Sequence, residues 1–109
     1  AYPYGAGIRW TVDMNRPAGQ RLYNIEVRER DGSSWEALQD TDELIVVSNS
    51  YTAAGRDGYV TFGTVSADGR ATDTFLDYAQ SFVDYMQEVS TIGKPAAQDY
   101  STQSYTAAD

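Results

Sequence analysis

The stretch Leu44–Phe62, with the sequence LIVVSNSYTAAGRDGYVTF, constrains the fold more than any other part of this chain. It begins with four consecutive apolar residues, Leu44 to Val47, and no polar residue alternates with them. Such a run predicts a strand that is buried on both faces. The run ends at Ser48–Tyr51 and continues through two alanines into the glycine-bracketed loop 55–58. A buried strand that opens into a small-residue loop is a common support for binding groups, so we expect function here.

Five residues of this stretch are candidate binding residues, and each has a structural alternative. Tyr51 offers a face for a planar ligand such as a nucleobase, or packs as an ordinary strand-end tyrosine. Asp57 could accept hydrogen bonds from sugar hydroxyls, or satisfy the backbone of its own turn. Asn49 could meet a polar ligand or cap the loop, and Arg56 could bind an anion or be solvated. Gly55 is suited to backbone conformations that strain other residues.

Histidine and cysteine are both absent from the 109 residues. A Ser-His-Asp triad cannot be built without histidine, and neither can a metal site with imidazole or thiolate ligands. Carboxylate sites for calcium or magnesium stay possible in principle. No run matches a calcium loop with alternating carboxylates, however. We therefore predict neither a metal site nor catalytic residues in this chain.

Acidic residues outnumber basic ones by 16 to 8, which gives a net charge of −8. Such a surface repels phosphate backbones, so a nucleic-acid polymer is not expected as a partner. No apolar run approaches the ~20 residues that cross a bilayer, so no membrane span is expected. Ala1 does not begin a signal peptide. The chain reads as mature, processed or cut from something longer.

Two alternating segments, residues 7–14 (GIRWTVDM) and 23–28 (YNIEVR), predict half-buried strands. A turn with Pro17 and Gly19 separates them, so they should pair as an antiparallel hairpin. We expect Asp13 with Arg16 and Arg21 to stabilise this hairpin, and the two tryptophans to pack in the core and at its rim. The segment 35–38 predicts a strand stub or a helical turn, and residues 59–62 predict a short extended piece.

A single amphipathic helix is predicted from about Thr72 to Ser90, because apolar side chains recur there at three- and four-residue spacing. Thr72 or Thr74 would cap its start. Residues 93–109 form either a tail or an edge strand. Strands followed by one helix predict an α+β fold: a small mixed or antiparallel sheet with this helix packed on it. Residues 1–109 would form a single domain.

Three pieces in this order resemble the C-terminal domain of the 5′-nucleotidase family, which includes UDP-sugar hydrolases and NAD nucleotidases. They are the strand GIRWTVD, the D-x-x-x-P-x-G-x-R turn, and the loop ending G-x-D-G-Y. The turn carries Asp13, Pro17, Gly19 and Arg21. The resemblance covers nearly the whole chain. It implies that residues 1–109 are the latter part of the substrate-binding domain of a larger hydrolase.

The resemblance also implies a function. The parent enzyme would cleave phosphate bonds of nucleotides with two divalent metal ions, held by an N-terminal metallophosphoesterase domain. This chain would be inactive alone and would form one wall of the base and ribose pocket. Tyr51 would stack on the base and Asp57 would bind the ribose hydroxyls, whereas Arg56 stands where the family often has glycine. The family implies a periplasmic, cell-surface or secreted location.

A non-enzymatic binding or interaction module is the alternative. In that case the acidic surface and the tyrosine-rich tail, with Tyr100 and Tyr105, would meet another protein.

Overall fold

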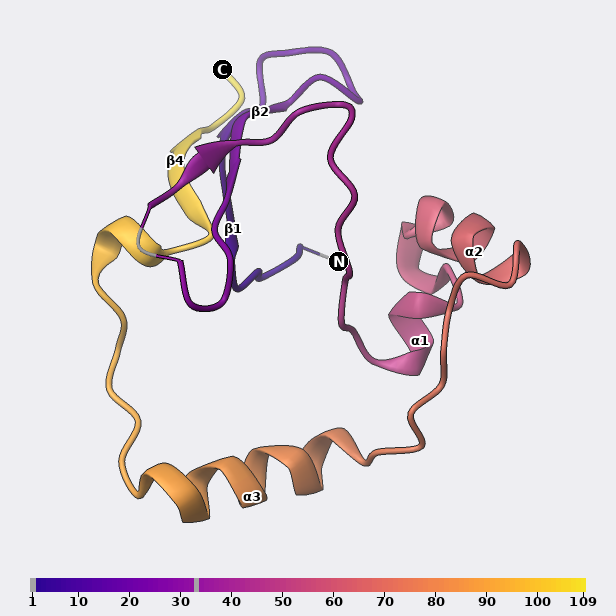
Figure 1. The fold of residues 1–109 in the computed structure, drawn as a ribbon. Coiled ribbons are helices and arrows are strands. Elements are labelled where there is room, and N and C mark those ends of the chain that lie inside the picture. Colours follow the sequence, from indigo (N-terminus) through magenta and orange to yellow (C-terminus); the bar gives the residue numbers. More distant parts are fainter. Residues whose placement is uncertain (1, 33) are drawn as a thin grey trace. The chain divides into compact units, whose positions relative to one another are not determined.

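The computed structural model describes residues 2–32 and 34–109. The chain divides into two compact units. Figure 1 labels helices and strands of both. The sheet unit consists of Tyr2–Glu43 together with Lys94–Asp109, and the helical unit consists of Leu44–Gly93. Together they give the α+β class that the sequence predicts.

Four strands form the sheet: β1 (Ile8–Asp13), β2 (Leu22–Val27), β3 (Glu36–Ala37) and β4 (Thr102–Thr106). Their order in the sheet is β3-β2-β1-β4. The β1–β2 and β2–β3 pairs are antiparallel, whereas β1 and β4 run parallel, so the sheet is mixed. The segment 35–38 thus supplies a strand stub, and the C-terminal tail supplies an edge strand.

The predicted hairpin is confirmed, with Ile8 opposite Val27 and Val12 opposite Leu22. Its alternation arises because only one face of β1 is buried: Trp10 is 5% exposed and Val12 is 2% exposed. The core of the described residues therefore lies on this face of β1.

Polar contacts close the hairpin turn, as the sequence predicts. The Asp13 N–H donates to the Arg21 carbonyl (2.9 Å), and the Asn15 N–H donates to the Asp13 carboxylate (2.9 Å). The Arg16 guanidinium lies 3.7 Å from the Asp13 carboxylate and 3.8 Å from the centre of the Tyr23 ring. These contacts fix the register of β1 against β2.

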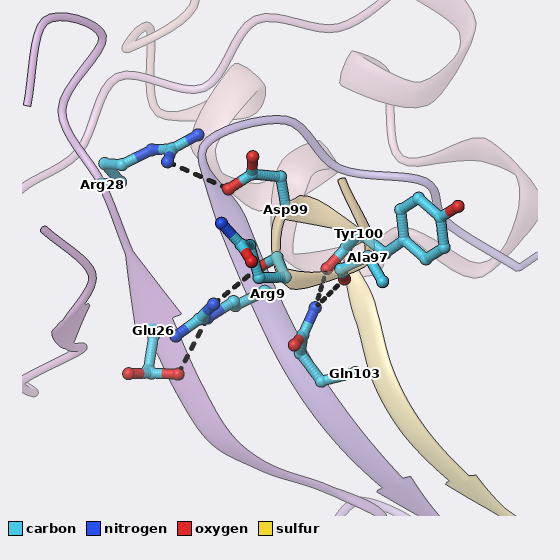
Figure 2. Close-up of polar contacts among 8 residues, drawn as sticks. Arg9, Glu26, Arg28, Ala97, Asp99, Tyr100 and Gln103 are labelled. Carbon is cyan, nitrogen blue, oxygen red and sulfur yellow. Dashed lines mark hydrogen bonds and ion pairs between the residues drawn. The ribbon is translucent and has the colours of Figure 1, made fainter. Parts of the chain in front are cut away.

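Arginine side chains connect the sheet to the short 3-10 helix η2 (Ala97–Asp99), as Figure 2 shows. Arg9 donates to the Glu26 carboxylate (2.9 Å) and to the Gln98 carbonyl (2.6 Å). Arg28 donates to the Asp99 carboxylate (3.0 Å). These bonds hold the segment that leads into β4.

Trp35 contacts two of these arginines. The guanidinium carbons of Arg9 and Arg28 are each 4.5 Å from the Trp35 ring centre. The indole is half-buried, and its Nε1 is buried without a hydrogen-bond partner in the structure. Trp10 therefore packs in the core and Trp35 at its rim, as predicted.

The helical unit contains α1 (Ser50–Ala53), the 3-10 helix η1 (Arg56–Gly58), α2 (Val60–Ala67) and α3 (Tyr78–Val89). The predicted buried strand at Leu44–Val47 is wrong. No strand is assigned there, and Ile45 and Val47 are 97% and 92% exposed. A strand needs a neighbour for its backbone groups, and the described residues provide none for this run.

The expectation of an extended piece at residues 59–62 is also wrong, because α2 begins at Val60. Side chains support the helix locally: the Thr64 hydroxyl donates to the Val60 carbonyl (3.2 Å). The Ser66 hydroxyl donates to the Ala53 carbonyl (2.6 Å) and so connects α2 to α1.

The predicted long helix exists but begins at Tyr78 instead of Thr72. Asp77, not a threonine, caps it by accepting a hydrogen bond from the Gln80 N–H (2.8 Å). Phe75 has φ = +55°, a left-handed value that an α-helix does not contain, so α3 cannot extend back through this residue. No residue of α3 is buried within the structure, and its packing on the sheet stays a prediction. None of the helices described is long and apolar enough to cross a membrane.

Candidate functional site

Tyr51 lies in the first turn of α1 and not in a loop after a strand. Asn49 starts this helix, since its side-chain oxygen accepts a hydrogen bond from the Thr52 N–H (2.8 Å). Of the two roles predicted for Asn49, the structure therefore shows the capping role. Tyr51 is 55% exposed, so part of its side chain is accessible to a ligand.

Left-handed backbone at three neighbouring positions shapes the loop after α1. Gly55 has φ = +84° and Gly58 has φ = +88°, which glycine adopts without strain. Asp57 lies between them with φ = +62°, a conformation that aspartate and asparagine tolerate better than most residues. The loop thus presents Arg56 and Asp57, both exposed, at a sharp reversal of the chain.

The structure brings Tyr51 and Arg56 together. The guanidinium carbon of Arg56 lies over the Tyr51 ring, 5.7 Å from its centre. At an exposed site such a cation–π contact contributes about 0.5–1 kcal/mol, which a ligand can readily replace. An aromatic face, a guanidinium and the Asp57 carboxylate are therefore close in sequence and carried by one short segment.

A hollow of about 370 Å³ lies beside this segment. Small side chains surround it: Ala54, Gly55, Val60, Gly63, Thr64 and Ala67. Of the predicted site residues only Gly55 borders it, so the hollow lies next to the aromatic face and not over it. Sequence analysis did not identify Gly63 as a residue near the candidate site. The pattern that could have indicated it is a glycine inside a segment that forms a helix.

The resemblance implies two divalent ions in another domain of the parent protein and none in this chain. Histidine and cysteine are absent from the sequence. The described residues contain no group of three or more aspartates and glutamates that could hold a metal ion.

Comparison with known proteins identifies the family. Residues 1–64 match the family described as "5′-nucleotidase, C-terminal domain". The chain belongs to this 5′-nucleotidase family. The match includes β1, β2, α1 and the whole Tyr51–Gly58 segment.

Similar proteins are bacterial. The chain is 40% identical over 91 residues to "NAD 5′-nucleotidase" of Haemophilus influenzae and 34% identical over 88 residues to "Probable 5′-nucleotidase" of Treponema pallidum. These alignments cover 81% and 80% of this chain. A third, to "Trifunctional nucleotide phosphoesterase protein YfkN" of Bacillus subtilis, is 32% identical over 66 residues and covers 61% of the chain and 4% of that protein. The chain spans 15% of the length of each of the first two relatives. No solved structure matches it.

Proposed function

We propose that this chain is the nucleoside-binding part of a metal-dependent nucleotide phosphohydrolase. In this proposal Tyr51 stacks on the base and Asp57 accepts hydrogen bonds from the ribose hydroxyls. The catalytic metal ions are held elsewhere, in an N-terminal metallophosphoesterase domain of the same protein. The chain contributes recognition and no catalytic residue.

One observation carries the proposal: the exposed Tyr51 side chain beside a loop in which Gly55 and Gly58 have left-handed backbone. A planar base that stacks on an aromatic side chain gains about 1–3 kcal/mol. A carboxylate accepts hydrogen bonds from neighbouring hydroxyls, as the two hydroxyls of a ribose would require. The 40% identity to a protein named NAD 5′-nucleotidase supports a nucleotide as the substrate.

Three further parts of the proposal come from family membership. The small share of the relatives that this chain covers supports a larger parent with another domain. Closure of the two domains on the nucleotide would bring its phosphate to the metals, which is a hinge-type motion. A periplasmic, cell-surface or secreted location is proposed on the same basis.

The test uses the full-length protein and the variants Tyr51→Ala and Tyr51→Phe. We expect Tyr51→Ala to lower kcat/KM for AMP, NAD or UDP-glucose about tenfold or more, because the stacking face is lost. Tyr51→Phe should stay within about twofold, since the ring remains. Tyr78→Ala is the matched control, because Tyr78 is also exposed but lies on α3. If Tyr51→Ala leaves every specificity constant within twofold of the parent value, the stacking role is wrong.

The sequence encoded before Ala1 tests the metal-domain part separately. We expect the metallophosphoesterase patterns D-x-H and G-N-H-[DE] there, because their histidines and aspartates are the metal ligands that this chain lacks. A full-length protein without these patterns would contradict the proposal that this chain is part of a phosphohydrolase and would favour the interaction module.

A further inference from the structure

Arg56 has an unusual electrostatic position within the helical unit. That unit holds two basic residues, Arg56 and Arg70, among six acidic ones: Asp57, Asp68, Asp73, Asp77, Asp84 and Glu88. Arg70 pairs with the Asp68 carboxylate at 3.6 Å. Among the described residues, no carboxylate forms an ion pair with Arg56. A guanidinium without a carboxylate partner therefore lies on an otherwise acidic unit.

The place of this guanidinium matters as much as its charge. It lies over the Tyr51 ring, 5.7 Å from the ring centre, in space that a stacked base would need. A base that stacks on this face of Tyr51 must displace Arg56, whereas a base on the opposite face leaves it in place, and in either case the guanidinium is close to the ring that carries the ligand. Gly55 and Asp57, on either side of it, both have left-handed backbone.

We propose that Arg56 is a specificity-determining residue that binds a phosphate group of the nucleotide whose base lies on Tyr51. This inference rests on the proposed function above. Guanidinium groups bind phosphate oxygens through two parallel N–H donors, and within the part of the chain that the structure describes the Arg56 guanidinium contacts an aromatic ring and forms no ion pair. The −8 net charge of the chain repels anionic ligands, so an unpaired cation at the base site favours nucleotides over nucleosides.

The experiment compares a charged and an uncharged ligand of the same base on the full-length protein. Adenosine is the uncharged probe, and α,β-methylene-ADP, whose P–C–P bridge resists hydrolysis, is the charged one. Their inhibition constants are measured for the parent protein, Arg56→Gln, Arg56→Lys and Tyr51→Ala. Arg70→Gln is the matched control, since it removes the same charge from the same unit at a residue that is paired with Asp68.

We expect Arg56→Gln to weaken α,β-methylene-ADP about five- to tenfold and to leave adenosine within about twofold. Arg56→Lys should retain part of the effect, because the charge remains while the paired donors are lost. The loss of α,β-methylene-ADP affinity in Arg56→Gln should become smaller as the salt concentration increases, because screening weakens an exposed charge contact. Arg70→Gln should change neither constant more than about twofold.

Two results would overturn the inference. An equal loss for both ligands after Arg56→Gln would show that Arg56 covers the base and does not bind phosphate. No loss for either ligand would show that it binds neither. Tyr51→Ala separates these failures from a failure of the proposed function: it should weaken both ligands, and if it changes neither, base stacking on Tyr51 is wrong regardless of Arg56.

Discussion

The backbones of Gly55 and Gly63 touch where the chain enters η1 above α2. A Cβ atom added at Gly55 would lie 2.7 Å from the Gly63 Cα and 3.0 Å from the Gly63 nitrogen. A Cβ atom added at Gly63 would lie 3.1 Å from the Gly55 Cα, so both positions are tightly packed and the two glycines allow this close approach of the backbones. This contact determines where Arg56 and Asp57 are held.

Replacing Gly55 with alanine should therefore destabilise the helical unit more than the backbone strain alone explains. Gly58→Ala is the matched control, because Gly58 has nearly the same φ (+88° against +84°) but nothing within 4 Å of an added Cβ. We expect Gly58→Ala to lower the free energy of unfolding by about 1–2 kcal/mol through strain. Gly55→Ala should lower it by about 1–3 kcal/mol more through overpacking. Urea unfolding of both variants gives the difference, and equal losses would contradict the Gly55–Gly63 contact.

The cap of α1 gives a second prediction. Asn49→Ala removes the acceptor for the Thr52 N–H and should lower stability by about 0.5–2 kcal/mol, whereas Asn49→Asp retains an acceptor and should stay close to the parent. Amide hydrogen exchange at Thr52 measures the effect locally. Faster exchange in Asn49→Ala and unchanged exchange in Asn49→Asp are expected. Unchanged exchange in both variants would show that α1 does not depend on this cap.

The contacts of Trp35 with Arg9 and Arg28 give a third prediction, for the sheet unit. Trp35→Leu removes the aromatic face that both guanidiniums contact, and we expect it to lower the free energy of unfolding by about 1–3 kcal/mol. Trp35→Phe should cost less than about 1 kcal/mol, because it keeps a ring and removes an indole N–H that has no partner. Thermal or urea unfolding checks both, and a leucine variant as stable as the phenylalanine one would show that the two cation–π contacts contribute little.

The sequence predicted the sheet hairpin because the evidence for it is local. Residues 7–14 alternate since one face of β1 is buried, and Pro17 and Gly19 mark a turn whatever the rest of the chain does. The parallel pairing of β4 with β1 could not be predicted. That pairing joins Trp10 with Thr102, residues about 90 positions apart, and no sequence pattern in the tail indicates which strand it pairs with.

The Leu44–Val47 run shows the opposite case. Its composition favours a buried strand, but composition cannot supply the neighbouring strand that would accept its hydrogen bonds, and the run is exposed in the structure. The segment after Tyr59 is rich in β-branched residues, yet it forms α2, because helix contacts such as Ser66 to Ala53 outweigh weak intrinsic preference. The candidate residues Tyr51, Arg56 and Asp57 are near one another whether the segment is a strand end or a helix, because they all lie within residues 51–57.

Asp57 gives the last prediction, which concerns substrate recognition. Asparagine tolerates left-handed backbone as well as aspartate does, so Asp57→Asn should keep the loop at φ = +62° while removing the charge. If Asp57 binds the ribose hydroxyls, the parent enzyme should turn over a 2′,3′-dideoxynucleotide with a KM about five- to twentyfold higher than the ribonucleotide. Asp57→Asn should raise KM for the ribonucleotide toward that value and leave the dideoxynucleotide nearly unchanged, because the interacting pair is already broken. Steady-state kinetics of both substrates on both proteins completes the cycle. If Asp57→Asn instead raises KM by the same factor for the ribonucleotide and the dideoxynucleotide, Asp57 supports the loop and does not contact the sugar.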